Sequence, residues 1–137
     1  MQTLELAVEH ATNREQFGQP IGRFQAVRHL LAWAAVECSA IRSVCIEAVR
    51  LDAAAPPLFG SLVKALAGRN ARRACEHTLQ VLGGMGFTAE HSHHRFHGRV
   101  LALDSLLGGS DELTHELGGA ARHGFAMSDI SRAFLLR

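Results

Sequence analysis

The chain has 137 residues, of which 47% are hydrophobic, and a formal net charge of +1 at pH 7. This length suits a single domain with its own apolar core, so we expect residues 1–137 to form one unit. The near-zero charge argues against electrostatic binding of nucleic acid or of an anionic membrane, and we expect neither as a partner.

The cysteines and the first residues of the chain bear on its location. Cys38, Cys45 and Cys75 are odd in number and form no Cys-x-x-Cys pair, which favours buried core thiols in a reducing compartment over a disulfide framework or a zinc site. The sequence has no run of about eighteen apolar residues and no signal-peptide pattern at its start. We therefore expect a cytoplasmic protein that binds no metal.

Helical spacing begins at once, since apolar residues stand at positions 4, 7, 8 and 11. No capping pair precedes them, a pattern typical of a start partway along a helix of a longer protein. Between Pro20 and Pro56-Pro57 the apolar residues alternate at intervals of three and four, which predicts one long bundle helix. The two prolines are expected to end it, because proline lacks the amide donor and disfavours helix in the preceding residue.

The second half of the chain is also predicted to be helical. A third helix is expected at residues 58–82, and after a glycine-rich loop a short, partly helical segment is expected around residues 89–97. Ser110 is a plausible N-cap for a fourth helix that ends near His123, and the tail from Ser128 is expected to add an amphipathic turn or two. No strand is predicted. The expected fold is all-α, an antiparallel up-and-down four-helix bundle.

A polar, turn-rich segment separates the first two predicted helices. Arg14 offers a planar fork of donors suited to a pyrophosphate, and Phe17 offers a flat face on which a purine can lie. Gly18 and Pro20 predict a sharp turn. The segment is therefore a candidate site for the adenosine half of a dinucleotide.

A second candidate segment ends the third predicted helix. Gly83 and Gly84 lack Cβ atoms, which permits left-handed backbone and close approach of a ligand. Gln80 lies one turn earlier and supplies an amide. Taken together, the two segments have the layout of a split cofactor site.

Two motifs make the chain resemble the C-terminal helical domain of acyl-CoA dehydrogenases. They are Arg-x-x-Phe-Gly-x-Pro-Ile-x-x-Phe-Gln at residues 14–25 and Gln-x-x-Gly-Gly-x-Gly-Phe at residues 80–87. The resemblance extends from about residue 4 to about residue 122, whereas the N-terminal helical domain and the β-domain of that family have no counterpart here. It implies an FAD-dependent oxidoreductase that dehydrogenates acyl-CoA thioesters, for example in fatty acid or steroid side-chain catabolism.

The resemblance also implies partners and site residues. Members of the family assemble as homo- or hetero-oligomers, in which both segments reach the flavin of a neighbouring subunit, and electron transfer flavoprotein accepts the electrons. The residues implied to contact FAD are Arg14, Phe17, Gln25, Gln80, Gly83, Gly84 and Ser110.

The chain departs from the family pattern at Gly108. In many members, the segment that residues 106–112 resemble carries a glutamate at this place, and that carboxylate removes the α-proton of the acyl thioester while a hydride leaves the β-carbon for the flavin. Glycine cannot take a proton, so no catalytic residue is assigned in this chain. Glu90 and Glu112 are the nearby carboxylates, and neither falls at the base position.

Three explanations of this departure stay open. The base can come from the helix before Arg14, as in other branches of the family, and be missing through truncation. The chain can be the non-catalytic partner in a mixed assembly, as in some actinobacterial steroid side-chain enzymes, whose Gly-Gly-x-Gly-Phe-Thr-x-Glu-His segments resemble residues 83–91. The domain can also be degenerate. The rival from another class is a helical module that acts in assembly and performs no chemistry.

Two further clusters have competing interpretations, and we favour the simpler one in each case. Four histidines crowd into residues 91–97. With no carboxylate or thiolate nearby beyond Glu90, we expect isolated surface histidines rather than a metal site. The arginines of residues 69–73 are expected to form a solvated or subunit-facing helix surface rather than a phosphate site.

Overall fold

The computed structural model describes residues 1–51 and 58–123. Its helices are α1 (Gln2–Asn13), α2 (Gln25–Leu51), α3 (Phe59–Leu82), α4 (His93–Ser105) and α5 (Ser110–Arg122). The predicted helix stop at Pro56-Pro57 and the predicted turns after Ser128 lie outside the described residues.

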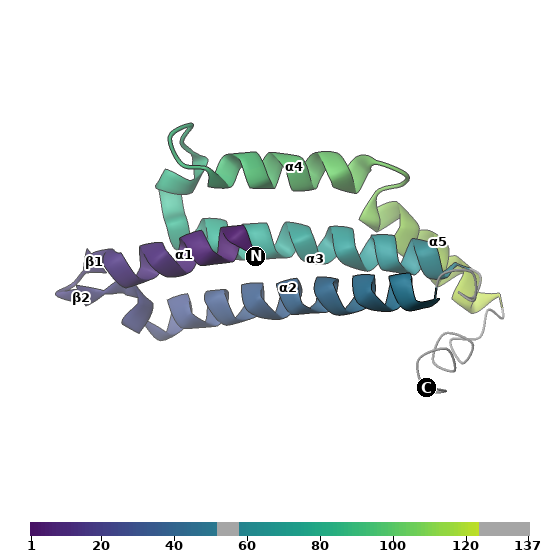
Figure 1. Ribbon diagram of the computed structural model, residues 1–137, viewed down its shortest axis with the longest axis horizontal. Coiled ribbons are helices and arrows are strands. Elements are labelled where there is room, and N and C mark those ends of the chain that lie inside the picture. The colour runs from purple at the N-terminus through teal and green to yellow at the C-terminus, as the bar shows by residue number, and fades with distance from the viewer. Residues whose placement is uncertain (52–57, 124–137) are drawn as a thin grey trace.

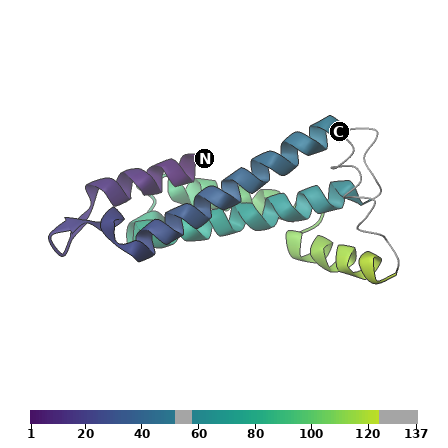
Figure 2. The same ribbon diagram turned by 90° about the horizontal axis from the view of Figure 1, so that it is seen from below.

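Helices α1 to α4 lie side by side along the long axis of the molecule, and each runs antiparallel to the next (Figure 1). The predicted all-α, up-and-down bundle is therefore confirmed. A further helix, α5, packs against α3 at the end of the molecule where α3 begins (Figure 2).

Helix α3 is the centre of the bundle and contacts the other four helices. Many of its buried residues are small, among them Ala65, Ala74 and Thr78, so that neighbouring backbones can approach closely. One apolar cluster joins Ala7 and Ala11 of α1 to Val81 of α3. Since Val81 directly follows Gln80, this cluster fixes the C-terminal end of α1 beside the C-terminal end of α3.

The structure corrects the expectation that the chain has no strand. Two short strands, β1 (Glu15–Gln16) and β2 (Gln19–Pro20), pair antiparallel directly after α1. The two residues between them, Phe17 and Gly18, both have positive φ angles, of 54° and 77°. This is the backbone geometry of a tight two-residue hairpin turn, which the predicted sharp turn did not specify.

Two further expectations are wrong in detail. Helix α4 has 13 residues and continues to Ser105, well beyond the short segment predicted around residues 89–97. A short 3-10 helix at Gly83–Phe87 precedes α4. Of the cysteines expected in the core, Cys75 is buried, Cys38 is half-buried and Cys45 is exposed.

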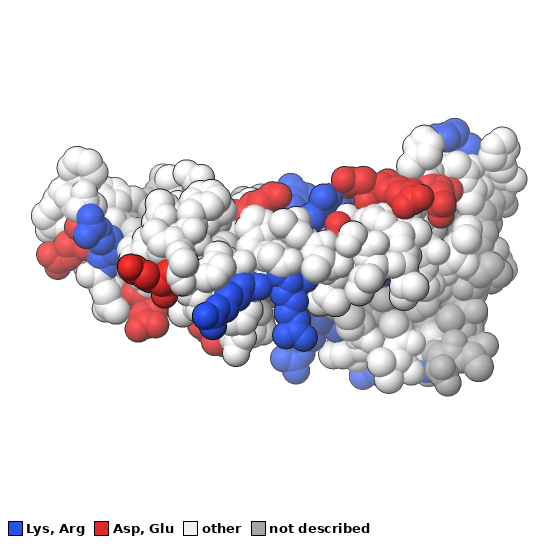
Figure 3. Space-filling view, turned by 90° about the horizontal axis from the view of Figure 1, so that it is seen from above, with Lys and Arg blue, Asp and Glu red and all other residues white. Residues whose placement is uncertain are grey.

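Charged side chains collect at α5. Figure 3 shows the acidic side chains gathered over this end of the molecule, and Asp111 and Glu112 fall in the first turn of α5. Carboxylates in a first turn interact favourably with the positive end of the helix dipole. These two residues therefore stabilise the start of α5.

Helix α2 carries an exposed apolar face. By length and composition alone it is long and apolar enough to cross a membrane, with a mean hydropathy of 1.3 in its most apolar window, although core helices of other bundles meet the same criterion. Only 11% of that window is buried. Trp33 is 59% exposed and Val36 is 55% exposed. Within residues 1–51 and 58–123, no element covers this face.

Candidate functional site

Six of the seven predicted flavin contacts lie at one end of the bundle. In Figure 1 the end of α1, the β1–β2 hairpin, the start of α2 and the end of α3 all meet at this end. The fold thus brings two segments, separated by about 55 residues of helix and loop, to the same end of the molecule. The residues on these elements are Arg14, Phe17, Gln25, Gln80, Gly83 and Gly84.

Arg14 has a fixed backbone and a free side chain. Its N–H donates to His10 O at 2.8 Å, and its carbonyl accepts from the N–H of Ile21, also at 2.8 Å. Its guanidinium makes no hydrogen bond or ion pair with any described residue, and the side chain is exposed. A preorganised arginine without a protein partner is suited to bind an external anion.

Phe17 stands at the tip of the hairpin in a conformation that costs free energy. Its φ of 54° is unfavourable for a bulky residue by about 1–2 kcal/mol. Its side chain is 92% exposed, and its ring forms a T-shaped pair with that of Phe24, with centroids 6.1 Å apart. Because strained backbone is concentrated at functional sites, this aromatic residue is a candidate ligand contact.

The glycines of the second segment have two different roles. Gly83 has a φ of 62°, and a Cβ on either Gly83 or Gly84 would meet no atom within 4 Å. Their surface is therefore open to an approaching ligand. In contrast, a Cβ on Gly86 would lie 2.7 Å from Leu79 Cδ1, so Gly86 serves internal packing. Gln80 is exposed beside this surface.

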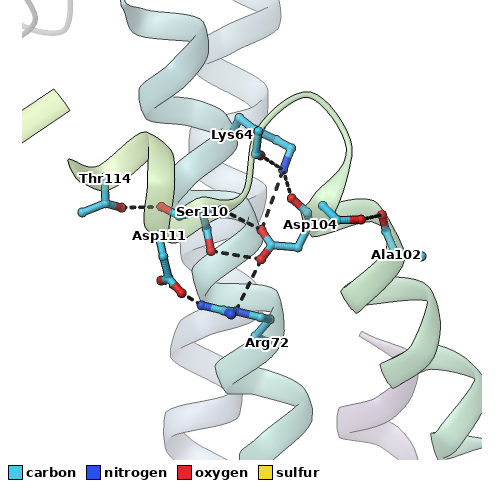
Figure 4. Close-up of polar contacts among 9 residues, drawn as sticks. Lys64, Arg72, Ala102, Asp104, Ser110, Asp111 and Thr114 are labelled. Carbon is cyan, nitrogen blue, oxygen red and sulfur yellow. Dashed lines mark hydrogen bonds and ion pairs between the residues drawn. The ribbon is translucent and has the colours of Figure 1, made fainter. Parts of the chain in front are cut away.

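Ser110, the seventh predicted contact, is at the other end of the bundle. Its side chain is 1% exposed, and its hydroxyl donates to Asp104 Oδ2 at 3.1 Å (Figure 4). Ser110 also packs beside Gly68 of α3, about 18 Å along the helix axis from Gln80 at 1.5 Å per residue. The fold does not bring Ser110 together with the other six residues.

The expectation that Ser110 caps α5 is also wrong by one residue. The N-cap is Gly109, and it makes no side-chain cap. The carboxylate of Asp104, from the end of α4, takes this role by accepting the N–H of Ser110 at 3.3 Å. A capping group from a different helix leaves no local signal in the sequence.

Asp104 is the centre of a buried ionic cluster that the sequence did not predict. Its side chain lies 3.7 Å from Lys64 Nζ and 3.5 Å from Arg72 Nε, and Arg72 also donates to Asp111 Oδ1 at 3.0 Å (Figure 4). A Cβ on Gly68 would overlap the Asp104 carboxylate. Gly68 is therefore what lets the carboxylate approach α3.

The arginines of α3 only partly form the solvated or subunit-facing surface that was expected, since Arg69 and Arg73 are exposed and Arg72 is half-buried. Arg72 belongs to the Asp104 cluster, and Arg73 Nε lies 3.6 Å from Oε1 of the buried Glu37 on α2. Both cations thus join α3 to neighbouring helices. Of the three arginines, Arg69 alone is exposed without a described ion pair.

Gly108 occupies a left-handed turn, with a φ of 95°. A Cβ built on it would lie 3.1 Å from Leu113 Cδ2 on α5. The preceding residue, Leu107, also has positive φ and is 94% exposed. The loop therefore directs the side chain of Leu107 outward. The two nearby carboxylates, Glu112 and Glu90, are exposed and lie on other segments.

The histidine segment is not a set of surface residues, because His93 is completely buried. Its Nε2 lies 3.0 Å from Thr78 Oγ1 and 3.2 Å from Cys75 O. The hydroxyl proton of Thr78 goes to α3 carbonyls, so we assign the ring proton to Nε2, which donates. Within residues 1–51 and 58–123, His93 Nδ1 has no hydrogen-bond partner. Among the described residues, no three His, Cys, Asp or Glu side chains are grouped to hold a metal.

Burial lowers the pKa of His93 from its usual value of 6.5. The unfolded chain therefore binds a proton at pH values at which the folded chain does not, and the free energy of unfolding should fall as the pH drops below about 6.5. Denaturant titrations at several pH values should show a smaller loss for His93→Gln than for the parent chain. Equal losses in His93→Gln and in the parent chain would contradict this assignment.

Comparisons with known proteins agree over nearly the whole chain. Residues 1–122 match the family model described as acyl-CoA dehydrogenase, C-terminal domain. The chain is 39% identical over 112 residues to the acyl-CoA dehydrogenase FadE34 of Mycobacterium tuberculosis, which covers 79% of this chain and 16% of that protein.

Solved structures show the same likeness. The chain resembles the ChsE4-ChsE5 complex of M. tuberculosis with a TM-score of 0.80 and 27% identity, over 91% of this chain and 35% of that one. It resembles a glutaryl-CoA dehydrogenase of Mycobacterium smegmatis in complex with FADH2 with a TM-score of 0.79 and 27% identity, over 91% of this chain and 33% of that one. The chain spans about a third or less of the length of these proteins. The chain belongs to the acyl-CoA dehydrogenase family, and its residues 1–122 correspond to the C-terminal domain of that family.

Proposed function

We propose that this chain is the part of a flavin-dependent acyl-CoA dehydrogenase that contacts FAD and joins subunits. The observation that carries the proposal is the free Arg14 guanidinium beside the strained, exposed Phe17, at the same end of the bundle as the open surface of Gly83 and Gly84. A cation, an aromatic face and an exposed glycine backbone fit the pyrophosphate and adenine of a dinucleotide.

Each residue has a distinct task in this proposal. Arg14 binds the pyrophosphate, Phe17 lies against the adenosine half, and Gln25 and Gln80 supply amides. Bound FAD supplies the acceptor for the hydride that leaves the β-carbon of the acyl thioester. The chain's own residues bind and orient the cofactor.

The two ends of the bundle serve two different flavins in this proposal. The loop that contains Gly108 and Ser110 is far from Arg14 along the axis, so in this proposal the two ends of one chain contact different cofactors. Each flavin is then shared between subunits, in a homo- or hetero-oligomer. The structural relative described as the ChsE4-ChsE5 complex supports an oligomer, and the relative in complex with FADH2 supports a bound flavin. The acyl-CoA substrate and electron transfer flavoprotein are proposed partners on the strength of the family.

The role of Arg14 can be tested in an assembly with a flavoprotein that supplies the other two domains. Arg14→Ala should weaken FAD binding by about tenfold to a hundredfold, because a charge-assisted hydrogen bond contributes about 1.5–3 kcal/mol. FAD release, followed by flavin fluorescence, measures the change. Arg50→Ala is the matched control, since Arg50 lies at the far end of α2 and pairs with Glu47. An equal loss in both variants would contradict the proposed contact.

The second candidate function is a subunit that assembles without catalysing. The exposed apolar face of α2 favours it, as does a loop that carries Leu107 and Gly108 where a carboxylate is usual. Purification of the chain together with its natural partner distinguishes the two candidate functions. A yellow complex with flavin absorbance supports the flavin-contacting role, whereas a stable, colourless oligomer supports assembly alone.

A further inference from the structure

An open groove continues the line of α1 along the surface of α3. Helix α1 has 12 residues and α3 has 24, and in Figure 1 α1 begins about halfway along α3, so it lies beside only the C-terminal half of α3. Two adjoining hollows of about 220 Å³ each follow the first residues of α1, and both are lined by α2, α3 and α4. We call them together the open groove, since they share four lining residues: Ile41, Ala71, Val100 and Leu103.

The lining of the open groove suits an α-helix. Its floor is formed by small residues of α3, and its walls mainly by apolar side chains of α2 and α4. Helix α1 fills the neighbouring half of the same space, since it too contacts α2, α3 and α4. It does so with Thr3, Ala7 and Ala11, which are buried at intervals of four residues, the spacing of the ridges by which helices pack. A further stretch of helix with small residues at the same spacing therefore fits the groove. The small floor residues are Ala67, Gly68, Ala71 and Ala74.

The end of α1 that borders the open groove has unpaired backbone donors. Its N-cap is Met1, which makes no side-chain cap, and within residues 1–51 and 58–123 the N–H groups of Gln2 and Thr3 have no acceptor. These donors and the positive end of the helix dipole are complementary to the free carbonyls at the C-terminus of another helix. Arg99, which lines the same part of the groove, is exposed and has no described ion pair. An occupant should therefore present its C-terminal end, with an acidic side chain, to the start of α1.

The floor sets the length of the occupant. Lys64 and Cys75 are the lining residues of α3 at the two ends of the open groove. The helix rises about 16 Å between them, at about 1.5 Å per residue. A helix of about ten residues covers this distance.

We propose that the open groove binds an apolar helix of about ten residues from the polypeptide segment that carries the other two domains of the enzyme. The helix lies end to end with α1 and parallel to it. Its small residues continue the spacing of Thr3, Ala7 and Ala11, and an acidic side chain meets Arg99. The source of the helix rests on the proposed function, because that function requires the other two domains.

A designed extension of the 137-residue chain tests the seating without any cofactor. About twelve residues of Ala, Leu, Glu and Lys continue α1 before Met1, with alanine at the fourth and eighth positions before Thr3 and leucines beside them. This aligned extension should raise the folding equilibrium constant about 30-fold to 1000-fold, because it buries about two or three leucines in the groove. A control extension of the same composition, with its apolar stripe on the opposite face of the helix, should stay within about threefold of the parent. Equal stability of the two extended chains in denaturant unfolding would overturn the proposal.

Thiol alkylation locates the added helix. Cys38 lines the open groove and is half-buried, whereas Cys45 is exposed on the same helix and does not line the groove. The aligned extension should slow alkylation of Cys38 by iodoacetamide about tenfold or more and leave that of Cys45 unchanged. Mass spectrometry of the digested chain measures both rates. Alkylation of Cys38 at the rate of the parent chain would overturn the seating of the helix in the groove.

An assembly with a flavoprotein that supplies the other two domains tests the source of the helix. Ala71→Lys places a second cation near Arg99 on the groove floor and should weaken association about tenfold to a hundredfold, because the ammonium loses water without gaining a partner. Ala102→Lys is the control, since Ala102 is exposed on α4 and does not line the groove. Sedimentation velocity measures both dissociation constants, and unfolding curves show that each variant is folded.

Equal dissociation constants for Ala71→Lys and Ala102→Lys would overturn the proposed source. The same assembly keeps this result apart from the flavin contact. Arg14→Ala should weaken FAD binding and leave association unchanged, so a failure of the proposed function is recognised separately from a failure of the groove.

Discussion

Gly68→Ala should lower the free energy of unfolding by about 2–4 kcal/mol, although alanine is the better helix former. The added methyl group would occupy the space of the Asp104 carboxylate. The carboxylate must then leave Lys64, Arg72 and Ser110, and buried charges that lose their partners are costly. Denaturant unfolding followed by circular dichroism measures the change.

Gly98→Ala is the matched control for this substitution. Gly98 lies inside α4, and a Cβ there would meet no atom within 4 Å. Its replacement should raise the free energy of unfolding by about 1 kcal/mol through helix propensity alone. A Gly68→Ala chain that is also more stable than the parent would contradict the close approach of the Asp104 carboxylate to α3.

Trp33→Asp should weaken assembly through α2 about 30-fold to 1000-fold. Exposed tryptophans on apolar faces are frequent anchors of interfaces, where truncation costs about 2–4 kcal/mol. The indole of Trp33 is 59% exposed on a helix that has few buried residues. A charged side chain at its place would have to be desolvated on association.

Sedimentation velocity over a range of concentrations measures this effect. Ala35→Asp places the same charge on the same helix, roughly 200° around its axis from Trp33, and should leave assembly within a few-fold of the parent. Unfolding curves of both variants show that the monomer is intact. An unchanged dissociation constant for Trp33→Asp would exclude this face of α2 as the subunit contact.

Much of the bundle could be predicted from the sequence because its helices are long and periodic. The apolar residues of α2 recur at intervals of three and four residues, and glycines directly after Leu82 end α3. These two patterns determine both helices with little ambiguity. The β1–β2 hairpin was missed because its turn uses Phe17 at positive φ, and a bulky residue gives no signal for that conformation. The C-terminal half of α4 was missed because it contains Gly98 and because Asp104, near its end, is held by tertiary contacts with Lys64 and Arg72 of α3.

The candidate site could be predicted where its residues are exposed and lie close together in the sequence. Arg14, Phe17 and the glycine pair lie in short, distinctive motifs, and the fold brings them to one end of the bundle. The Asp104 cluster was not predictable, since it joins three helices through side chains up to 40 residues apart along the chain. The flavin contact implied for Ser110 stays a prediction, and its hydroxyl is bonded to Asp104 inside the protein.

The central claim is that this domain provides one side of a flavin site that other domains and a second subunit complete. The most direct test is a titration of FAD into the purified 137-residue chain alone, followed by flavin fluorescence. We predict no binding at micromolar FAD, because Arg14, Phe17 and the glycines form an open surface that buries little of the cofactor. A submicromolar dissociation constant would contradict the split site.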